Sequence, residues 1–209
     1  MRRIDLNEAA DFLRNSDSFL ILMHGSPDGD TIGCGTALCA ALQQIGKKAK
    51  AVCPDPVPKK FGYMFREIKE QEFEPQTIVT VDVADPKLLY SMQEVGEKAQ
   101  LCIDHHVSNT EYAERLLLAP EYAAAAELMF ELLKSMPEVK ITDAIADSLY
   151  TGIATDSGCF KYSNTSPQTH VYAAELIQFG ADIVPINYAM FDMKSQGRLK
   201  LEQAVLSRI

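Results

Sequence analysis

The residues best suited to chemistry in this chain are Asp104, His105 and His106, which directly follow the apolar run 101–103. Half of the chain's four histidines stand here. An apolar run that ends in polar residues is typical of a buried strand whose polar end emerges at the sheet edge. Because neighbouring side chains of a strand point to opposite faces, two adjacent histidines cannot serve one atom within a strand. We therefore expect 104–106 to begin a loop above the carboxyl edge of a sheet, where ligands bind in α/β proteins.

Further acids and one further histidine follow other apolar runs or a predicted helix: His24, Asp28, Asp30, Asp82 and Asp156. The carboxyl ends of parallel strands converge, so these groups could meet in one cleft. Any single acid of this set could instead be a helix cap or a turn residue. Taken together, several carboxylates beside neutral imidazoles repel one another unless cations lie among them. The set therefore indicates a metal site.

An oxygen-rich set of donors with some histidine suits Mn²⁺, Mg²⁺ or Co²⁺ better than a thiolate zinc site does. The carboxylates of Asp28, Asp30, Asp82 and Asp156 carry four negative charges, which two divalent ions would neutralise. A carboxylate that bridges two ions about 3.5–4 Å apart would activate a shared hydroxide for in-line attack on phosphorus. The pattern therefore favours two-metal chemistry on a phosphate.

The composition restricts the alternatives. The chain has 209 residues, of which 47% are hydrophobic, so it can form a substantial core. Its net charge of −9 argues against a nonspecific grip on long duplex nucleic acid, although bound metal ions could still attract an anionic substrate. The five cysteines include no Cys-x-x-Cys pair, so most are interpreted as reduced, small hydrophobic residues. No signal core and no run of membrane-spanning length is found, so we expect a cytoplasmic protein without a membrane partner.

The elements that must position the acids and histidines alternate between strands and helices. Strands are predicted at 19–23, 50–53, 77–81, 100–103 and 115–118. Helices are predicted at 5–14, 31–45, shortly after Pro86, and at 122–134, 142–154, 167–180, 182–191 and 194–209. Because most of the strands are apolar throughout, the predicted fold class is α/β, a parallel β-sheet with helices on both faces.

Several polar residues receive structural interpretations. Asp30 is placed to cap the helix 31–45, and Gly46 to end it. Asp143 and Asp147 are interpreted as a cap and a solvated helix face, and His170 as a surface residue.

A family resemblance adds to this pattern. The sequence His-Gly-Ser-Pro-Asp-Gly-Asp-Thr-Ile-Gly at 24–33 resembles the first motif of the DHH phosphoesterases. Asp82, Asp104–His106 and Thr155–Phe160 resemble the second, third and fourth motifs, in the order of the family. The resemblance extends over residues 18–192. It implies a DHH catalytic domain at residues 1–192, followed at 193–209 by a linker helix toward a C-terminal substrate-binding domain that is absent from this chain.

The resemblance also implies a role for each residue. His24, Asp28 and Asp82 would hold one metal ion, and Asp30, Asp82, His105 and Asp156 a second, with Asp82 bridging; Mn²⁺ is the expected ion. His106 would contact the scissile phosphate and protonate the leaving oxygen as the general acid. Asp104 would orient a histidine, and Asn109 would be a polar contact to the substrate.

Within the family, the resemblance is greatest to the nanoRNases and 3′-phosphoadenosine 5′-phosphate (pAp) phosphatases. It implies metal-dependent hydrolysis of short oligoribonucleotides, of a nucleoside 3′,5′-bisphosphate, or of both. One alternative is a manganese-dependent inorganic pyrophosphatase, which Gly29 disfavours because those enzymes usually have threonine between the two acids. Another is a catalytically silent metal-binding or interaction module, and the sequence also leaves a homodimer open.

Overall fold

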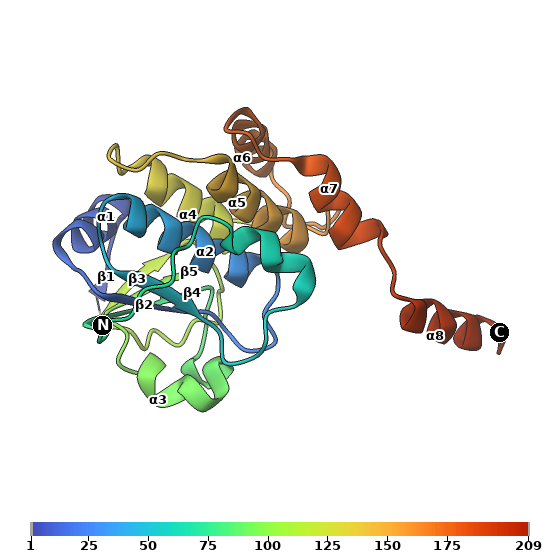
Figure 1. Ribbon diagram of the computed structural model, residues 1–209, viewed down its shortest axis with the longest axis horizontal. Helices are drawn as coiled ribbons and strands as arrows, with labels where there is room; N and C mark the ends of the chain where they lie inside the picture. Colours follow the sequence, from blue (N-terminus) through green and yellow to red (C-terminus); the bar gives the residue numbers. More distant parts are fainter. Residues whose placement is uncertain (1, 209) are drawn as a thin grey trace.

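A single sheet of six strands forms the centre of the molecule in the computed structural model, which describes residues 2–208 (Figure 1). Every paired strand is parallel to its neighbour, in the order β1-β6-β5-β4-β2-β3. The strands are β1 Arg2–Arg3, β2 Phe19–Leu22, β3 Ala49–Val52, β4 Thr77–Val81, β5 Leu101–Asp104 and β6 Arg115–Leu118. The predicted parallel sheet is confirmed, and β1 is a strand that the sequence did not reveal.

The helices cover the two faces unequally. The α-helices are α1 Leu6–Asn15, α2 Gly29–Gln44, α3 Gln93–Gly96, α4 Ala125–Lys134, α5 Asp143–Asp156, α6 Pro167–Gln178, α7 Ile183–Asn187 and α8 Gln196–Leu206. Two 3₁₀ helices span Lys59–Phe65 and Pro86–Met92, and a π-helix spans Tyr188–Asp192. In Figure 1, α1, α2, α4, α5 and α6 lie on one side of the sheet, whereas α3 lies on the other.

The sheet is apolar on both faces because both are covered. Phe19 and Ile21 of β2 are buried in the larger core, which includes α2, α4 and α5. Leu20 and Leu22 alternate with them and pack on the other face with Leu89. A strand buried on both faces needs apolar residues at every position, which explains the continuous apolar run.

Two glycines allow α2 and α5 to approach each other closely. A Cβ atom on Gly33 of α2 would collide with the backbone oxygen of Ser148 in α5. A Cβ atom on Gly152 of α5 would lie 2.7 Å from Asp30 Oδ1. The absence of side chains at these positions therefore brings the first turn of α2 against α5.

Several boundaries differ from the predictions. Asp28, not Asp30, caps α2, because its Oδ1 accepts the N–H groups of Asp30 and Thr31. Asp104 is the last residue of β5 and not the start of a loop, and Asp156 lies inside α5 and not after it. Helix α4 begins at Ala125, three residues later than predicted, because Ala124 has an extended backbone.

The end of α2 agrees with its prediction. Gly46 follows the helix with φ of +81°, and Gly46 N–H and Lys47 N–H bond back to Gln43 O and Leu42 O. This is the Schellman arrangement, for which glycine is favoured.

The segment after α7 leads away from the sheet. Helix α8 extends from the body of the molecule (Figure 1), and no residue of α8 is buried. Among residues 2–208, none of the helices combines the length and the apolar character needed to cross a membrane.

Candidate metal centre

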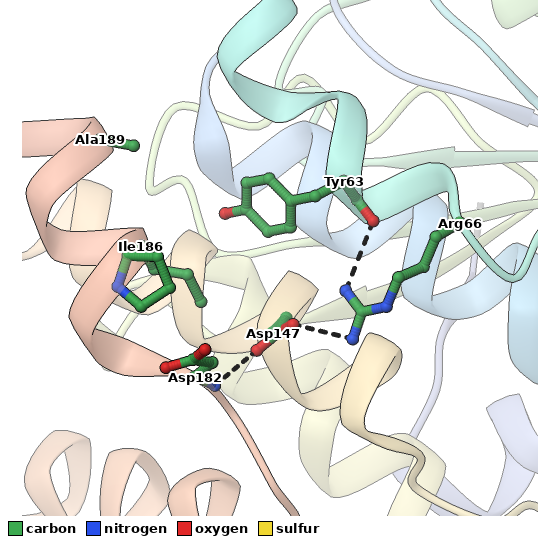
Figure 2. A pocket seen from close by; sticks show the side chains of 7 residues that line it. Tyr63, Arg66, Asp147, Asp182, Ile186 and Ala189 are labelled. Atoms are coloured by element: carbon green, nitrogen blue, oxygen red, sulfur yellow. Dashed lines mark hydrogen bonds and ion pairs between the residues drawn. The ribbon is translucent and has the colours of Figure 1, made fainter.

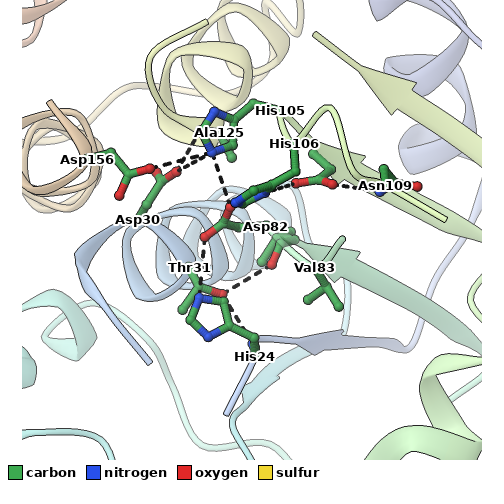
Figure 3. Close-up of polar contacts among 12 residues, drawn as sticks. His24, Asp30, Thr31, Asp82, Val83, His105, His106, Asn109, Ala125 and Asp156 are labelled. Atoms are coloured by element: carbon green, nitrogen blue, oxygen red, sulfur yellow. Dashed lines mark hydrogen bonds and ion pairs between the residues drawn. The ribbon is translucent and has the colours of Figure 1, made fainter. Parts of the chain in front are cut away.

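The carboxyl edge of the sheet gathers the acids and histidines that the sequence singled out (Figure 3). His24 follows β2, and Asp28 and Asp30 stand at the start of α2. Asp82 follows β4, while His105 and His106 follow β5. Asp156 reaches the same place from the last turn of α5. Strand ends that converge on one edge, together with two helix ends, therefore place the six proposed metal ligands in a single cluster.

Asp82 lies at the middle of this cluster. Its Oδ2 atom is 3.5 Å from His24 Nε2, and its Oδ1 atom is 3.6 Å from His105 Nε2. The two oxygens of one carboxylate thus face two different histidines. This is the placement that a carboxylate shared by two cations requires.

Two groups of donor atoms lie on either side of Asp82. One donor atom from each of His24, Asp28 and Asp82 lies within 4.8 Å of the others. The same holds for Asp30, His105 and Asp156, and His105 Nε2 is 3.5 Å from Asp156 Oδ2. The first group is one of the two ligand sets that the family resemblance implies. The second group is the other set without Asp82, whose Oδ1 atom lies near His105 Nε2. The role of these residues as ligands stays a prediction.

Buried atoms without partners indicate that the cluster suits cations. Asp82 Oδ1 and His105 Nε2 are buried and have no hydrogen-bond partner in the part of the chain that the structure describes. Leaving a buried acceptor and a ring nitrogen unsatisfied is costly, so such atoms need an explanation such as a bound ion. Both atoms point into the cluster, where oxygen and imidazole nitrogen are donors that Mn²⁺ and Mg²⁺ accept.

The carboxylates also repel one another in the metal-free chain. Burial, and then the nearby charges of Asp28 and Asp82, raise the pKa of Asp156 to about 8. Burial and the charges of Asp82 and Asp156 raise the pKa of Asp30 well above its usual value. Cations among these acids would remove the repulsion. The raised pKa values and the buried atoms without partners therefore both indicate a site for cations.

The same negative charges favour the protonated, positively charged form of His24. Burial alone would lower its pKa, but hydrogen bonds to Asp28 and Asp82 outweigh burial and raise the pKa to about 11. Its Nδ1 atom lies 2.7 Å from the carbonyl oxygen of Gly25. That contact fixes the ring so that Nε2 faces Asp28 and Asp82.

His106, Asp104 and Asn109 form a chain of contacts beside the cluster. His106 Nδ1 lies 2.8 Å from Asp104 Oδ1, and the hydrogen bond to Asp104 raises the pKa of His106 to about 9. Asp104 is fully buried, and its Oδ2 accepts a 2.6 Å hydrogen bond from Asn109 Nδ2. Asn109 Oδ1 accepts the N–H of Glu111. Both ends of the Asn109 amide are thus engaged within the protein, and the contact to substrate predicted for Asn109 stays a prediction.

Asp30 has a contact that sequence reasoning missed. Its Oδ2 accepts the N–H of Ala125 at 2.6 Å, and its Oδ1 accepts the N–H of Ala126 at 2.9 Å. These N–H groups open α4, and the residue before them, Ala124, has no side chain that could cap the helix. A proposed metal ligand in α2 therefore caps α4. The only signal in the sequence is the alanine run 123–126, which lacks a capping residue of its own.

Asn164 was also missed. Its Nδ2 donates to the carbonyl oxygens of Ala123 and Asp156, both at 3.1 Å. It thereby joins the end of α5 to the segment before α4, next to the cluster. Nothing in its neighbourhood in the sequence distinguishes it from an ordinary loop asparagine.

Two other polar residues lie outside the cluster. His170 is exposed, as predicted, and its ring stacks on Phe160 with centroids 5.1 Å apart.

Asp147 was predicted to be solvated, and this prediction is wrong. It is 7% exposed, pairs with Arg66 at 2.8 Å and accepts the N–H of Asp182 (Figure 2). A cavity of about 280 Å³ next to this pair is also lined by Asp182 and by apolar groups of Tyr63, Pro185, Ile186 and Ala189.

Known protein families and curated proteins resemble this chain over most of its length. Residues 18–153 match the family described as "DHH family, N-terminal domain". A protein of Thermus thermophilus named "Bifunctional oligoribonuclease and PAP phosphatase NrnA" is 32% identical over 79% of this chain and 51% of its own length. The Bacillus subtilis protein of the same name is 26% identical over 78% of this chain and 53% of its own length. The chain thus spans about half the length of these curated relatives.

A solved structure has a closely similar fold. The crystal structure of an exopolyphosphatase-related protein from Bacteroides fragilis superposes with a TM-score of 0.85 at 26% sequence identity. The superposition covers 97% of this chain and 64% of the other.

Proposed function

Since this chain belongs to the DHH family, we propose that it is a metal-dependent phosphoesterase that hydrolyses short oligoribonucleotides, nucleoside 3′,5′-bisphosphates such as pAp, or both. The observation that carries the proposal is the cluster around Asp82, where two buried atoms with no partner among residues 2–208 face two sets of acid and histidine donors. The substrate class comes from the names of the Thermus and Bacillus relatives, which this chain resembles over nearly four fifths of its length.

His24, Asp28 and Asp82 would hold one divalent ion, and Asp30, Asp82, His105 and Asp156 a second; we propose Mn²⁺ for both. Bound ions would neutralise phosphate charge and supply an activated water molecule as the nucleophile at neutral pH. The residues themselves keep the donors in place, because the Asp30 carboxylate is fixed by two backbone N–H groups and the His24 ring by a backbone carbonyl.

His106 is placed to handle the proton of the leaving group. Its Nδ1 faces Asp104, which leaves Nε2 on the opposite edge of a ring whose side chain is 43% exposed. When the bond from phosphorus to the leaving oxygen breaks, a proton on Nε2 can pass to that oxygen. Asp104 orients the ring for this transfer, and Asn109 holds Asp104.

The test is hydrolysis and metal binding by the purified chain. With Mn²⁺, we expect release of mononucleotides from a diribonucleotide or of phosphate from pAp, and slower hydrolysis of pyrophosphate. Asp82→Asn should lower kcat/KM by about a hundred-fold or more. Loss of a residue that only orients a metal ligand usually costs about 10- to 100-fold, and loss of a ligand should cost at least as much. Calorimetry should show Mn²⁺ binding by the wild type and weakened binding by this variant.

Asp143→Asn is the matched control. Asp143 is an exposed acid at the other end of α5, so its loss removes one negative charge without touching the cluster. Full activity of Asp82→Asn would contradict the bridging role of Asp82. A wild-type chain that binds no Mn²⁺ would favour the alternative of a catalytically silent module, and preference for pyrophosphate would favour the pyrophosphatase.

The division at residue 192 also stays a proposal. We infer that residues 193–209 form a linker toward a substrate-binding domain. Exposure supports this inference, because every described side chain from Met193 to Leu206 is exposed apart from the half-buried Glu202. Recognition of the nucleotide by residues 1–192 alone would then be incomplete.

A further inference from the structure

Tyr90 has a backbone conformation that side chains normally avoid. Its φ is +48° and its ψ is −114°, and it interrupts the 3₁₀ helix Pro86–Met92. Glycine occupies this region readily, whereas a bulky residue there is a true outlier. Such strained residues persist where the surrounding structure holds them, and they are concentrated at ligand-binding sites.

The ring of Tyr90 is held against the loop that carries His24. A Cβ atom on Gly25 would collide with the Cδ2 and Cε2 atoms of the tyrosine ring, so the ring lies directly on the glycine backbone. Gly25 N–H also donates to Leu88 O at 2.7 Å. Because Gly25 follows His24, the ring lies next to the backbone of a proposed metal ligand.

This ring contributes little to the core. Tyr90 is 53% exposed and belongs to none of the buried clusters, whereas its neighbour Leu89 is fully buried. Packing alone therefore does not explain an aromatic residue that is strained, half exposed and in contact with the residue after His24.

We propose that Tyr90 is a base-stacking residue, on whose ring a nucleobase of the substrate lies while the phosphate occupies the metal centre. The inference rests on the proposed function. Every nucleobase has a π-face, so stacking on an aromatic ring binds nucleotides without selecting a sequence. Stacking also suits a chain of net charge −9, because it provides affinity without a basic surface.

The test compares pAp with its base-free analogue, in which a tetrahydrofuran ring bears the same two phosphates. In Tyr90→Gly, KM for pAp should rise roughly five- to a hundred-fold, the usual range for loss of one stacked base. KM for the base-free analogue should change far less, and Tyr90→Phe should bind pAp as the wild type does.

Tyr188→Ala is the matched control, since Tyr188 is 59% exposed but belongs to the segment after α7, on the other side of the sheet from α3. An equal loss for pAp and the base-free analogue, or weakened Mn²⁺ binding in Tyr90→Gly, would overturn the inference, because the ring would then act through His24. No effect of Tyr90→Gly on either substrate would overturn it as well. If the wild type hydrolyses neither of these compounds nor a diribonucleotide, the proposed function fails first and this inference fails with it.

Discussion

Asp82 illustrates how a single residue can be unfavourable for the fold and favourable for the site. It has φ of +57°, it is 3% exposed, and its Oδ1 atom has no partner within residues 2–208. Burial raises its pKa, against the opposing hydrogen bond from His24. A residue that is strained, buried and unsatisfied at once needs a compensating ligand. The proposed cations would supply it.

Replacement of Asp156 should change the stability of the protein in opposite directions without and with metal ions. Asp156→Asn should raise the free energy of unfolding of the metal-free chain by about 1–3 kcal/mol, because it replaces a carboxyl group that must take up a proton at neutral pH to lie among the other acids. With Mn²⁺ the order of the two stabilities should reverse, since the variant lacks one of the proposed ligands. Calorimetric Tm values with a chelator and with Mn²⁺ measure both effects, and a lower metal-free Tm in the variant would contradict the electrostatic explanation.

The stability of the metal-free wild type should also depend on pH through Asp156. The pKa of Asp156 is raised from 3.8 to about 8, so between these values the folded chain holds a proton that the unfolded chain has lost. Stability from this group therefore falls as pH rises through that window. Asp156→Asn should flatten this part of the Tm profile, and an unchanged profile would speak against the raised pKa.

The gathering of the acids and histidines could be predicted from sequence because the carboxyl ends of parallel strands converge. Contacts between two particular side chains could be predicted only where the two residues are close in sequence. Asp104 and His106 are two residues apart, and the expectation that Asp104 orients a histidine agrees with their 2.8 Å contact. Asp147 was misjudged because its partner Arg66 lies far away in sequence. Local spacing carries no information about such a pair.

Among the elements, the turn before β2 holds the starts of three strands together. Asp17 Oδ1 accepts the N–H of Ser18 and of Lys48, just before β3, and Asp17 O accepts the hydroxyl of Thr77, the first residue of β4. Ser18 O accepts the N–H groups of Gln76 and Thr77. The register of β2, β3 and β4, on which the convergence of the strand ends depends, is thus fixed at the opposite edge.

Asp17→Ala should therefore destabilise the fold by about 1–3 kcal/mol, since two backbone N–H groups lose a charged acceptor. These hydrogen bonds lower the pKa of Asp17 below 3.8, so its contribution is present above that value and is lost as pH falls through the lowered pKa. Urea unfolding measures the free energy of unfolding of both proteins. The difference between Asp17→Ala and the wild type should be smaller at pH 3 than at pH 7. Asp17→Asn, which keeps an acceptor, is the control, and a difference that grows on acidification would contradict the prediction.

The elements themselves were largely predictable because each apolar run is bounded by glycine, proline or acids. The strands predicted at 77–81 and 115–118 have the bounds of β4 and β6. The two-residue strand β1 escaped because its residues, Arg2 and Arg3, are exposed and charged and form a strand only through pairing with β6. The start of α4 was misplaced because its cap, Asp30, comes from another helix.

At the scale of the whole molecule, α8 is separate from the body. Glu202 forms ion pairs with Lys194 and Arg198, which lie in the same segment, and Leu201 is 66% exposed. Ending the chain at Asp192 should therefore change Tm by less than about 2 °C, and Mn²⁺ affinity should be retained. Thermal unfolding and calorimetry of the shortened chain would show this, and a large drop in Tm would mean that 193–209 stabilises the body.

The double contact of Asp30 with α4 also bears on how the molecule forms. Asp30 and Ala125 are 95 residues apart, and their hydrogen bond exists only after α2 and α4 have met. The proposed second ion site would therefore depend on a contact between distant parts of the chain, and a partly folded chain that lacks α4 would hold Asp30 poorly. Mn²⁺ added during refolding should then act late: it should slow unfolding more than it speeds folding, so that the ion secures a finished structure and does not help to build one.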